Sequence, residues 1–292
     1  RSDAAASTDL PMDLRDALRV PPQEGRVLRA WTADGDVTLP LAPGTYSVEA
    51  HSSWRHETES AGGVVVTATE AGEVSLTLAE VVPHAGWLAM DSHLHAAPST
   101  DGSLPMEDRL IACAATGVDI PVTTDHDRQS DYRPLATALG LDDRLLLIPG
   151  VEVSPVLRGH FNLFPVVPAG PEVTNGGAPA WWEAFADTEA LFARIRASAP
   201  AGAILQVNHG RSDPSGLMSA ADYDPGSGTA FRPDFWSFSF DAFELINDRG
   251  VNEWAGPRAD WFSWLNLGQI RLPTGVSDSH GRSTPCGYGR TD

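Results

Sequence analysis

The segment Trp87-Leu-Ala-Met-Asp-Ser-His-Leu-His95 joins a short apolar run to two histidines that are two positions apart. The run 87–91 has the length and composition of a buried strand, and the histidines follow where that strand ends. Side chains two positions apart on an extended chain point to the same face, so both imidazoles are expected to reach one point. Neutral imidazole is a ligand that suits zinc, manganese and iron. The segment therefore predicts a strand that delivers a pair of metal ligands.

From Gly86 onward, the chain repeats a pattern of strand, loop and helix. After the strand at 87–91, strands are predicted at 120–124, 145–149, 161–166, 203–208, 242–246 and 272–277. Helices are predicted at 105–116, 133–140, 187–198 and 255–267, and Asp187 is the expected N-cap of the third. Apolar strands that alternate with helices imply a parallel sheet, and seven of them imply a barrel or a distorted barrel.

A different pattern precedes this region. Alternating apolar and polar residues, broken by turn residues, predict about five strands, at 26–31, 37–41, 45–51, 63–69 and 73–79. The prediction is a tail or linker at 1–24, a small antiparallel β-domain of sandwich type at 25–84 and the barrel at 85–292. His51, His56 and His84 lie in or beside the small domain and are expected at its surface.

The six remaining histidines all fall in short segments that also carry acids or lie at predicted strand ends. After the first pair, these segments are Ser99-Thr-Asp101-Gly, Thr124-Asp125-His126-Asp127, Gly150-Val-Glu152, Gly159-His160, Asn208-His209-Gly-Arg211 and Ser277-Asp278-Ser-His280. Catalytic residues of such barrels collect at the C-terminal ends of the strands. Clustered imidazoles and carboxylates predict two or three divalent ions (zinc, manganese or iron) and a hydrolase whose nucleophile is a metal-bridging hydroxide.

The order of these motifs resembles the polymerase-and-histidinol-phosphatase (PHP) superfamily over residues 86–292. The run Glu244-Leu-Ile-Asn247 is similar to a pattern of the branch that hydrolyses carbaryl and carbofuran, whose members often carry an N-terminal β-domain. The resemblance implies a distorted (β/α)7 barrel, an α/β fold, and a site that usually holds three ions.

The resemblance also implies three ligand sets in this chain. They are His93, His95, Glu152 and Asp278 for the first ion, Glu152, His160 and His209 for the second, and Asp101, His126 and His280 for the third. Glu152 would bridge two ions. The spacing from His95 to Asp101 is one residue longer than in the commonest form of the family, and without Asp101 the site would hold two ions.

Several further residues have expected roles. Glu152, Asp278, His280 and Arg211 are the candidate catalytic residues, with Asp278 or His280 passing a proton to the leaving group. Arg211 would either bind a substrate anion or form a salt bridge. Asp91, Asp125 and Asp127 are expected to orient neighbouring groups. Asn247 would contact substrate or cap a turn.

Three functions remain open from the sequence. The first is hydrolysis of small phosphate esters, for which Arg158, Arg211 and Arg282 would supply positive charge. The second is hydrolysis of a carbamate or related ester, with Trp181 and Trp182 lining an aromatic pocket or only packing a loop between 165 and 183. The third is a binding protein on an inactive scaffold. A Gly-x-Ser-x-Gly nucleophile motif is absent from the sequence.

The amino-acid composition limits which classes of partner the protein can bind. The formal net charge of −19 argues against nucleic acid, while a small anionic ester remains compatible once metal is bound. No apolar run approaches the ~20 residues of a membrane helix. Two cysteines are too few for a disulfide framework, so Cys113 is expected in the core and Cys286 in an exposed loop. The sequence begins at Arg1, as a processed or trimmed product would, and export is weakly favoured over a cytoplasmic location.

Overall fold

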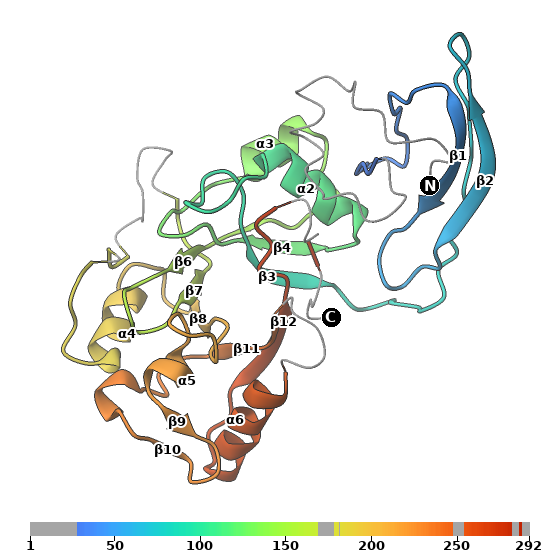
Figure 1. Cartoon of the computed structure of the whole chain (residues 1–292). Coiled ribbons are helices and arrows are strands. Elements are labelled where there is room, and N and C mark those ends of the chain that lie inside the picture. Colours follow the sequence, from blue (N-terminus) through green and yellow to red (C-terminus); the bar gives the residue numbers. More distant parts are fainter. Residues whose placement is uncertain (1–27, 169–177, 181, 248–253, 282–285, 288–292) are drawn as a thin grey trace.

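The computed structural model describes residues 28–168, 178–180, 182–247, 254–281 and 286–287, which form a mixed α/β protein built around two sheets (Figure 1). The five-stranded sheet has the order β12-β11-β8-β7-β6, with β6 at Val151–Val153, β7 at Phe161–Phe164, β8 at Ile204–Val207, β11 at Ala242–Asn247 and β12 at Leu272–Val276. The three-stranded sheet has the order β3-β4-β5, with β3 at Met90–Leu94, β4 at Ile120–Thr123 and β5 at Ile148–Pro149. All seven strands predicted after Gly86 are present, and β6 is an additional one.

The two sheets approach each other on both sides without merging into one ladder. On one side, Gly150 alone separates β5 from β6, and an isolated bridge pairs His126 with Glu152. On the other side, a single bridge pairs Leu94 with Ser279. A side chain on Gly150 would meet Thr124 and other neighbours at 3.1–3.2 Å, which explains the glycine at this close approach.

The closed seven-stranded barrel is not confirmed. Regular backbone breaks where the strands end: Asp127, His209 and Asp278 have positive φ values of 49°, 27° and 47°. A residue in this conformation interrupts a strand ladder. Asp127 and Asp278 adjoin the two single bridges that join the sheets.

The expectation of an all-parallel sheet is also wrong in part. Strand β7 runs antiparallel to both β6 and β8, whereas β8, β11 and β12 are parallel to one another. The segment between β6 and β7 is a short loop without a helix, and a short loop returns the chain antiparallel. As a result, the N-terminal end of β7 lies at the same edge as the C-terminal ends of the parallel strands.

The predicted helices are confirmed with slightly shorter bounds. They are α2 at Met106–Ala115, α3 at Arg133–Ala138, α4 at Thr188–Arg196 and α6 at Ala255–Asn266. The side chain of Asp187 caps α4 by accepting a hydrogen bond from Ala190 N, as expected. The sequence analysis missed the elements between β8 and β11, which are α5 at Leu217–Ala220, β9 at Tyr223–Asp224, β10 at Thr229–Ala230 and a 3₁₀ turn at Pro233–Phe235.

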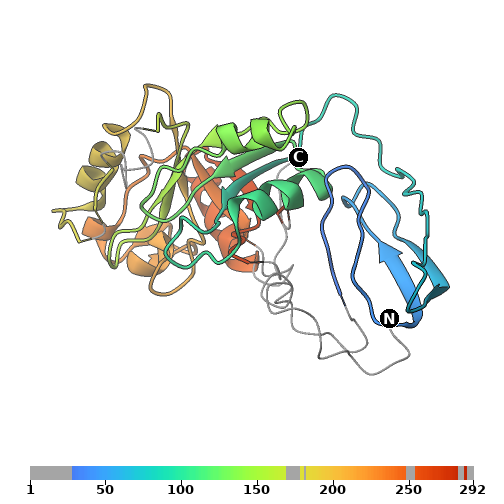
Figure 2. The ribbon, with the colours of Figure 1, turned by 90° about the horizontal axis from the view of Figure 1, so that it is seen from above.

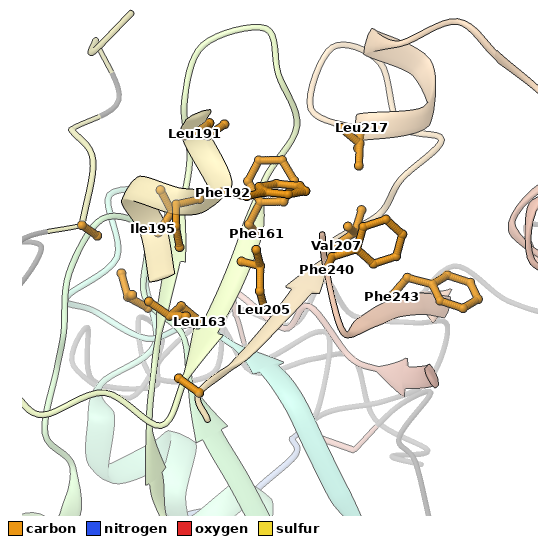
Figure 3. Close-up of a cluster of buried hydrophobic side chains, with 14 of the residues drawn as sticks. Phe161, Leu163, Leu191, Phe192, Ile195, Leu205, Val207, Leu217, Phe240 and Phe243 are labelled. Carbon is orange, nitrogen blue, oxygen red and sulfur yellow. The ribbon is translucent and has the colours of Figure 1, made fainter. Parts of the chain in front are cut away.

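Alternation along β7 and β8 separates an apolar face from a polar one. Phe161 and Leu205 point to the apolar face, where they pack with Leu191, Phe192 and Ile195 of α4 (Figure 3). The rings of Phe161 and Phe192 meet edge to face at 4.9 Å between centroids. Full burial of each of these side chains contributes about 1.5–3 kcal/mol, which fixes the sheet against the helix. The residues between them therefore point to the opposite face.

That opposite face is polar and buried. Asn162 of β7 and Gln206 of β8 are paired in register, and both are fully buried. Glu244 of β11 is buried beside them and accepts a hydrogen bond from Gln206. An interior of amides and carboxylates is costly unless each group finds a partner. This polar interior leads directly to the candidate site.

The N-terminal region forms one hairpin, which lies at one end of the molecule beside α2 (Figures 1 and 2). Strands β1 at Gly44–Ala50 and β2 at Glu59–Val66 pair antiparallel. The five-stranded sandwich is not confirmed, because 37–41 and 73–79 contain no strand. Tyr46 is the only buried residue of β1 and β2, too little apolar surface to hold two layers together.

Contacts with the end of α2 hold the hairpin region in place. Ser52 Oγ donates to Ala115 O at 3.0 Å, and the buried Arg55 reaches Asp119 at 3.5 Å. His51 and His84 are about half exposed and pair with neighbouring glutamates, so their expected surface position is confirmed.

A disulfide joins Cys113 of α2 to Cys286, with 5.0 Å between the Cα atoms and 173 residues between them in sequence. The exposed position expected for Cys286 is wrong, because this residue is only 1% exposed. The neighbouring Gly287 N donates to Asp91 Oδ2 at 2.7 Å, which links this segment to β3.

The tail at 1–24, Trp181 and Arg282 lie outside the described residues. In the part of the chain that is described, no helix has both the length and the apolar character needed to cross a bilayer.

Candidate metal centre

All nine predicted ligands lie at one edge of the two sheets, at or just beyond strand ends. They are His93, His95, Asp101, His126, Glu152, His160, His209, Asp278 and His280, and each contacts at least one other member. His160 immediately precedes β7, whereas the other histidines lie at the C-terminal ends of their strands. Only the antiparallel direction of β7 brings His160 to the same edge.

Glu152 lies at the centre of this cluster and is fully buried. Its Oε2 lies 3.1 Å from His93 Nε2, 3.2 Å from His95 Nε2 and 3.1 Å from His126 Nδ1. Its Oε1 lies 3.2 Å from His160 Nδ1 and 3.4 Å from His209 Nε2. One carboxylate therefore contacts five imidazoles, the arrangement expected of a bridging ligand.

Three overlapping groups have the composition of metal sites. They are His93, His95 and Asp278; His126, Glu152 and His160; and His95, Asp101, His126 and His280. The first and third groups contain the first and third sets expected from the sequence, apart from Glu152, which contacts the first. The second group contains His126 in place of the expected His209, which contacts Glu152 from outside the group. Asp101 Oδ2 lies 3.2 Å from His126 Nε2 and 3.1 Å from His280 Nε2, so the longer spacing does not remove this residue from the cluster.

Outer partners orient most of the imidazoles. Hydroxyl groups contact Nδ1 of three of them: Ser99 contacts His95, Ser154 contacts His126 and Ser215 contacts His209. His280 Nδ1 donates to its neighbour's carbonyl, Asp278 O, at 2.8 Å.

His93 Nδ1 lies 2.6 Å from Glu244 Oε1. An imidazole that donates through Nδ1 presents the Nε2 lone pair to the cluster, as ligand histidines do.

The donor set fits divalent metal ions. Two ligands about 2.0–2.1 Å from one tetrahedral ion are about 3.3 Å apart. This is close to the 3.1–3.3 Å that separate the Nε2 atoms of His93 and His95 from carboxylate oxygens of Glu152 and Asp278. Glu152 Oε2 and His160 Nδ1 are buried and have no hydrogen-bond partner among the described residues, despite their close neighbours. Lone pairs that converge without aligned protons are suited to cations.

The cluster strongly couples its ionisable groups. Burial acts to raise the pKa of Glu152, but the charges of His93 and His126 hold it well below its usual range. Burial lowers the pKa of His126, but the charges of Glu152 and Asp101 outweigh this effect and raise it to about 9. Asp278 likewise has a pKa held well below its usual range by His93 and His95, against the effect of burial. The carboxylates are therefore ionised and favour cations between them.

The sequence analysis did not identify the amides that support Glu152. Asn208 Nδ2 donates to Glu152 Oε1 at 2.9 Å and to Asn162 Oδ1 at 2.8 Å, and Asn162 in turn donates to Ser92 O. Gln206 donates to Asn208 Oδ1 at 3.4 Å. These amides could have been found from the sequence, because they are polar residues at inward positions of otherwise apolar strands. A polar side chain in a buried strand needs a hydrogen-bond partner.

The three aspartates expected to orient neighbours all bind backbone groups. Asp91 accepts from Ser277 N at 3.1 Å and from His93 N at 3.3 Å. Asp125 accepts from Ala96 N at 3.0 Å, and Asp127 accepts from Ser154 N at 3.1 Å. They hold the ligand-bearing segments in position and contact no imidazole nitrogen through a hydrogen bond.

An open cleft of about 450 Å³ leads to the cluster. Six of the candidate ligands line it, together with the polar residues Arg211, Ser212, Asp213, Ser215, Glu244 and Asn247 and the apolar residues Leu245, Ile246, Trp254 and Pro257. The cleft is large enough for a small organic molecule.

Two arginines considered from the sequence have different positions. Arg211 lies in the cleft wall and forms the salt bridge, donating through Nε to Asp260 Oδ2 at 2.8 Å and through Nη2 to Tyr223 O. Arg158 is not part of the cleft lining, since it donates to the carbonyls of Asp234 and Phe185. Asn247 donates to Glu244 and to Asp278 and does not act only as a turn cap.

No family model matches the sequence, and no curated protein matches it. Several solved structures are similar to this chain at low identity, among them the following three. A two-domain protein from Bacteroides vulgatus, described as containing a predicted PHP-like metal-dependent phosphoesterase, is 19% identical with a TM-score of 0.44, over 66% of this chain and 52% of its own. This chain thus spans about half the length of that protein.

The second is an amidohydrolase from Chromobacterium violaceum with bound sulfate and no metal, 16% identical with a TM-score of 0.47, over 70% of this chain and 91% of its own. The third, from Bifidobacterium adolescentis, is named as a metal-dependent phosphoesterase and is 16% identical with a TM-score of 0.46, over 70% of this chain and 92% of its own. At these identities and TM-scores, the similarity assigns no function to this chain.

Proposed function

We propose that this protein is a metal-dependent hydrolase of the PHP type that acts on small phosphate esters. The observation that carries the proposal is the position of Glu152, a buried carboxylate in contact with five imidazoles at the base of an open cleft. The order of the motifs in the sequence and the convergence of all nine positions support the same assignment.

The three groups described above would hold two or three zinc, manganese or iron ions. Such ions would lower the pKa of water to about 7 and polarise the ester bond under attack. The chain itself supplies the proton carriers. Asp278 Oδ1 lies 3.3 Å from the Nε2 atoms of His93 and His95, and His280 is one-third exposed at the cleft. If only two ions bind and the third group stays without one, His280 would be free to pass a proton to a leaving group in the cleft.

An anionic substrate is supported by the charges of the cleft. Among the described residues of its lining, one guanidinium, that of Arg211, lies with four imidazoles and with the carboxylates of Asp101, Asp213, Glu244 and Asp278. Bound ions would add positive charge to this lining and leave Arg211 to contact a substrate oxygen. Asp260 and Tyr223 engage its Nε and Nη2, and no described residue accepts from Nη1.

A carbamate or other uncharged ester is the second candidate. The apolar residues of the cleft lining, Leu245, Ile246, Trp254 and Pro257, favour a substrate with an apolar group. Trp254 carries the Arg258 guanidinium 4.2 Å from its ring centroid, which orders the indole.

The first test is hydrolysis of p-nitrophenyl phosphate by protein stripped with a chelator and reloaded with manganese, zinc or iron. Glu152→Ala should abolish both metal binding and turnover. His51→Ala removes an imidazole that is more than half exposed outside the cluster and serves as the matched control, with unchanged rates.

Other results of the metal-binding and hydrolysis tests would support a different function. Metal binding without phosphatase activity, combined with turnover of an aryl carbamate, would replace the phosphate proposal by the second candidate. Metal binding with neither activity would favour a binding protein. Absence of metal binding by the unaltered protein would reject the proposed function itself.

We also propose that residues 85–292 form the hydrolase unit, with 25–84 as an accessory region, and that the protein works in an oxidising compartment. The second point is supported by the buried disulfide between Cys113 and Cys286, because such bonds persist mainly in exported proteins. Thiol titration of protein isolated from its natural compartment tests this: two free thiols would contradict it. Deletion of 1–81 tests whether the accessory region is needed for turnover.

A further inference from the structure

Glu244 is a buried carboxylate of β11 that no ligand set includes. Four donors converge on it. Its Oε1 lies 2.6 Å from His93 Nδ1 and 3.2 Å from Gln206 Nε2. Its Oε2 lies 2.5 Å from His209 N and 2.7 Å from Asn247 Nδ2. With two donors on each oxygen, the carboxylate is fully used as an acceptor.

Two of these donors belong to candidate metal ligands, His93 and His209. A third belongs to Asn247, which contacts the candidate ligand Asp278. His93 belongs to the first group and His209 contacts the other oxygen of Glu152. Asn247 Nδ2 also reaches Asp278 Oδ2 at 3.3 Å. Glu244 thus connects β11 to His93 across 151 residues of sequence, to His209 across 35 and, through Asn247, to Asp278.

The hydrogen bond from His209 N to Glu244 also stabilises an unusual backbone conformation of His209. The backbone of His209 has a φ of 27°, a conformation that residues with a side chain rarely adopt. Its amide N–H points at Glu244 Oε2, and this charge-assisted hydrogen bond offsets the cost of that conformation. The side chain of His209 is thereby directed towards Glu152.

We propose that Glu244 is the positioning residue of the metal centre: it holds His93 in the form that presents Nε2 to an ion and fixes the backbone of His209. The inference rests on the proposed metal site. Glu244 itself has no free lone pair for an ion, which separates its role from that of Glu152.

Glu244→Gln is the informative change because it preserves shape while it alters the hydrogen bonding and removes the negative charge. The amide group of glutamine has one acceptor end and one donor end. If the donor end faces His93, the imidazole must move its proton to Nε2, where it blocks the metal ligand. If the donor end faces the other way, His209 N and Asn247 lose their acceptor. Either orientation disturbs a ligand.

The experiment measures the affinity of chelator-stripped protein for zinc by competition with a metal indicator. Glu244→Gln should weaken zinc binding by about 10–100-fold, as changes to the partners of ligand histidines do. Glu189→Gln is the matched control, because this carboxylate accepts hydrogen bonds from Ser237 and Ser239 far from the cluster. It should bind zinc like the unaltered protein.

A second measurement needs no variant. In zinc-loaded protein, ¹⁵N spectroscopy of the histidine side chains should show His93 protonated at Nδ1 and coordinated through Nε2. Coordination through Nδ1, or an affinity of Glu244→Gln within twofold of the unaltered protein, would overturn the proposal. Failure of the unaltered protein to bind zinc would instead reject the metal site, so the two failures are distinguishable.

Discussion

Asn208 donates a side-chain hydrogen bond of 2.9 Å to Glu152 Oε1, the oxygen that also faces His160 and His209. Both residues are fully buried. The amide therefore sets the orientation of the carboxylate that all three ligand groups share or contact. Its own carbonyl oxygen accepts from Gln206, so the amide is held in a single orientation.

Asn208→Ala should weaken the affinity for manganese or zinc by about 10–100-fold and lower kcat, because Glu152 would lose its orienting donor. Metal titration of the stripped protein checks this. Asn266→Ala, an exposed residue at the end of α6, is the control and should have no effect. Equal metal affinity of the Asn208 variant and the control would show that Glu152 is oriented without this amide.

Metal affinity should depend on pH in a defined direction. The pKa of His126 is raised to about 9, so the metal-free protein keeps a proton on this imidazole below that pH. An ion needs the neutral imidazole and must displace the proton, so affinity should rise from pH 6 to 9 and level off above. Calorimetry in buffers of different ionisation enthalpy measures the protons released. Affinity that is constant between pH 6 and 9 would contradict the assignment of His126 as a ligand.

Removing the disulfide should destabilise the fold. Cys286→Ser is expected to lower the free energy of unfolding by about 2–5 kcal/mol, because the bond closes a loop of 173 residues in the unfolded chain. The variant also releases the segment whose Gly287 N binds Asp91. Denaturant titration checks the value. Cys113→Ser and the double variant should show the same loss, and three different values would mean that each sulfur contributes by packing.

Arg211→Ala should cost stability as well as substrate affinity. Asp260 is fully buried and would lose its charged partner. Because Arg211 is one-third exposed, we expect a loss of about 2–3 kcal/mol, below the 3–5 kcal/mol of a fully buried pair. Adding Asp260→Asn should recover part of it. In metal-loaded protein the KM for a phosphate ester should rise; a raised KM without loss of stability would mean that Asp260 has found another donor.

The sequence by itself determined the chemistry of the site. Imidazoles and carboxylates in short segments near the ends of predicted strands named all nine members of the cluster. These features are local, because they depend on residue type and on the geometry of one extended segment. The same local signals located the four main helices and the cap at Asp187.

Only the tertiary structure decided how the strands are paired and which distant groups meet. The antiparallel direction of β7, which brings His160 to the ligand edge, depends on packing across the sheet rather than on the composition of the strand. The contact of Glu244 with His93 and the disulfide between Cys113 and Cys286 join residues 151 and 173 positions apart. Periodicity reports which face a side chain occupies, but it carries no information about the partner on the facing strand, because that partner is selected by the packing of the whole chain.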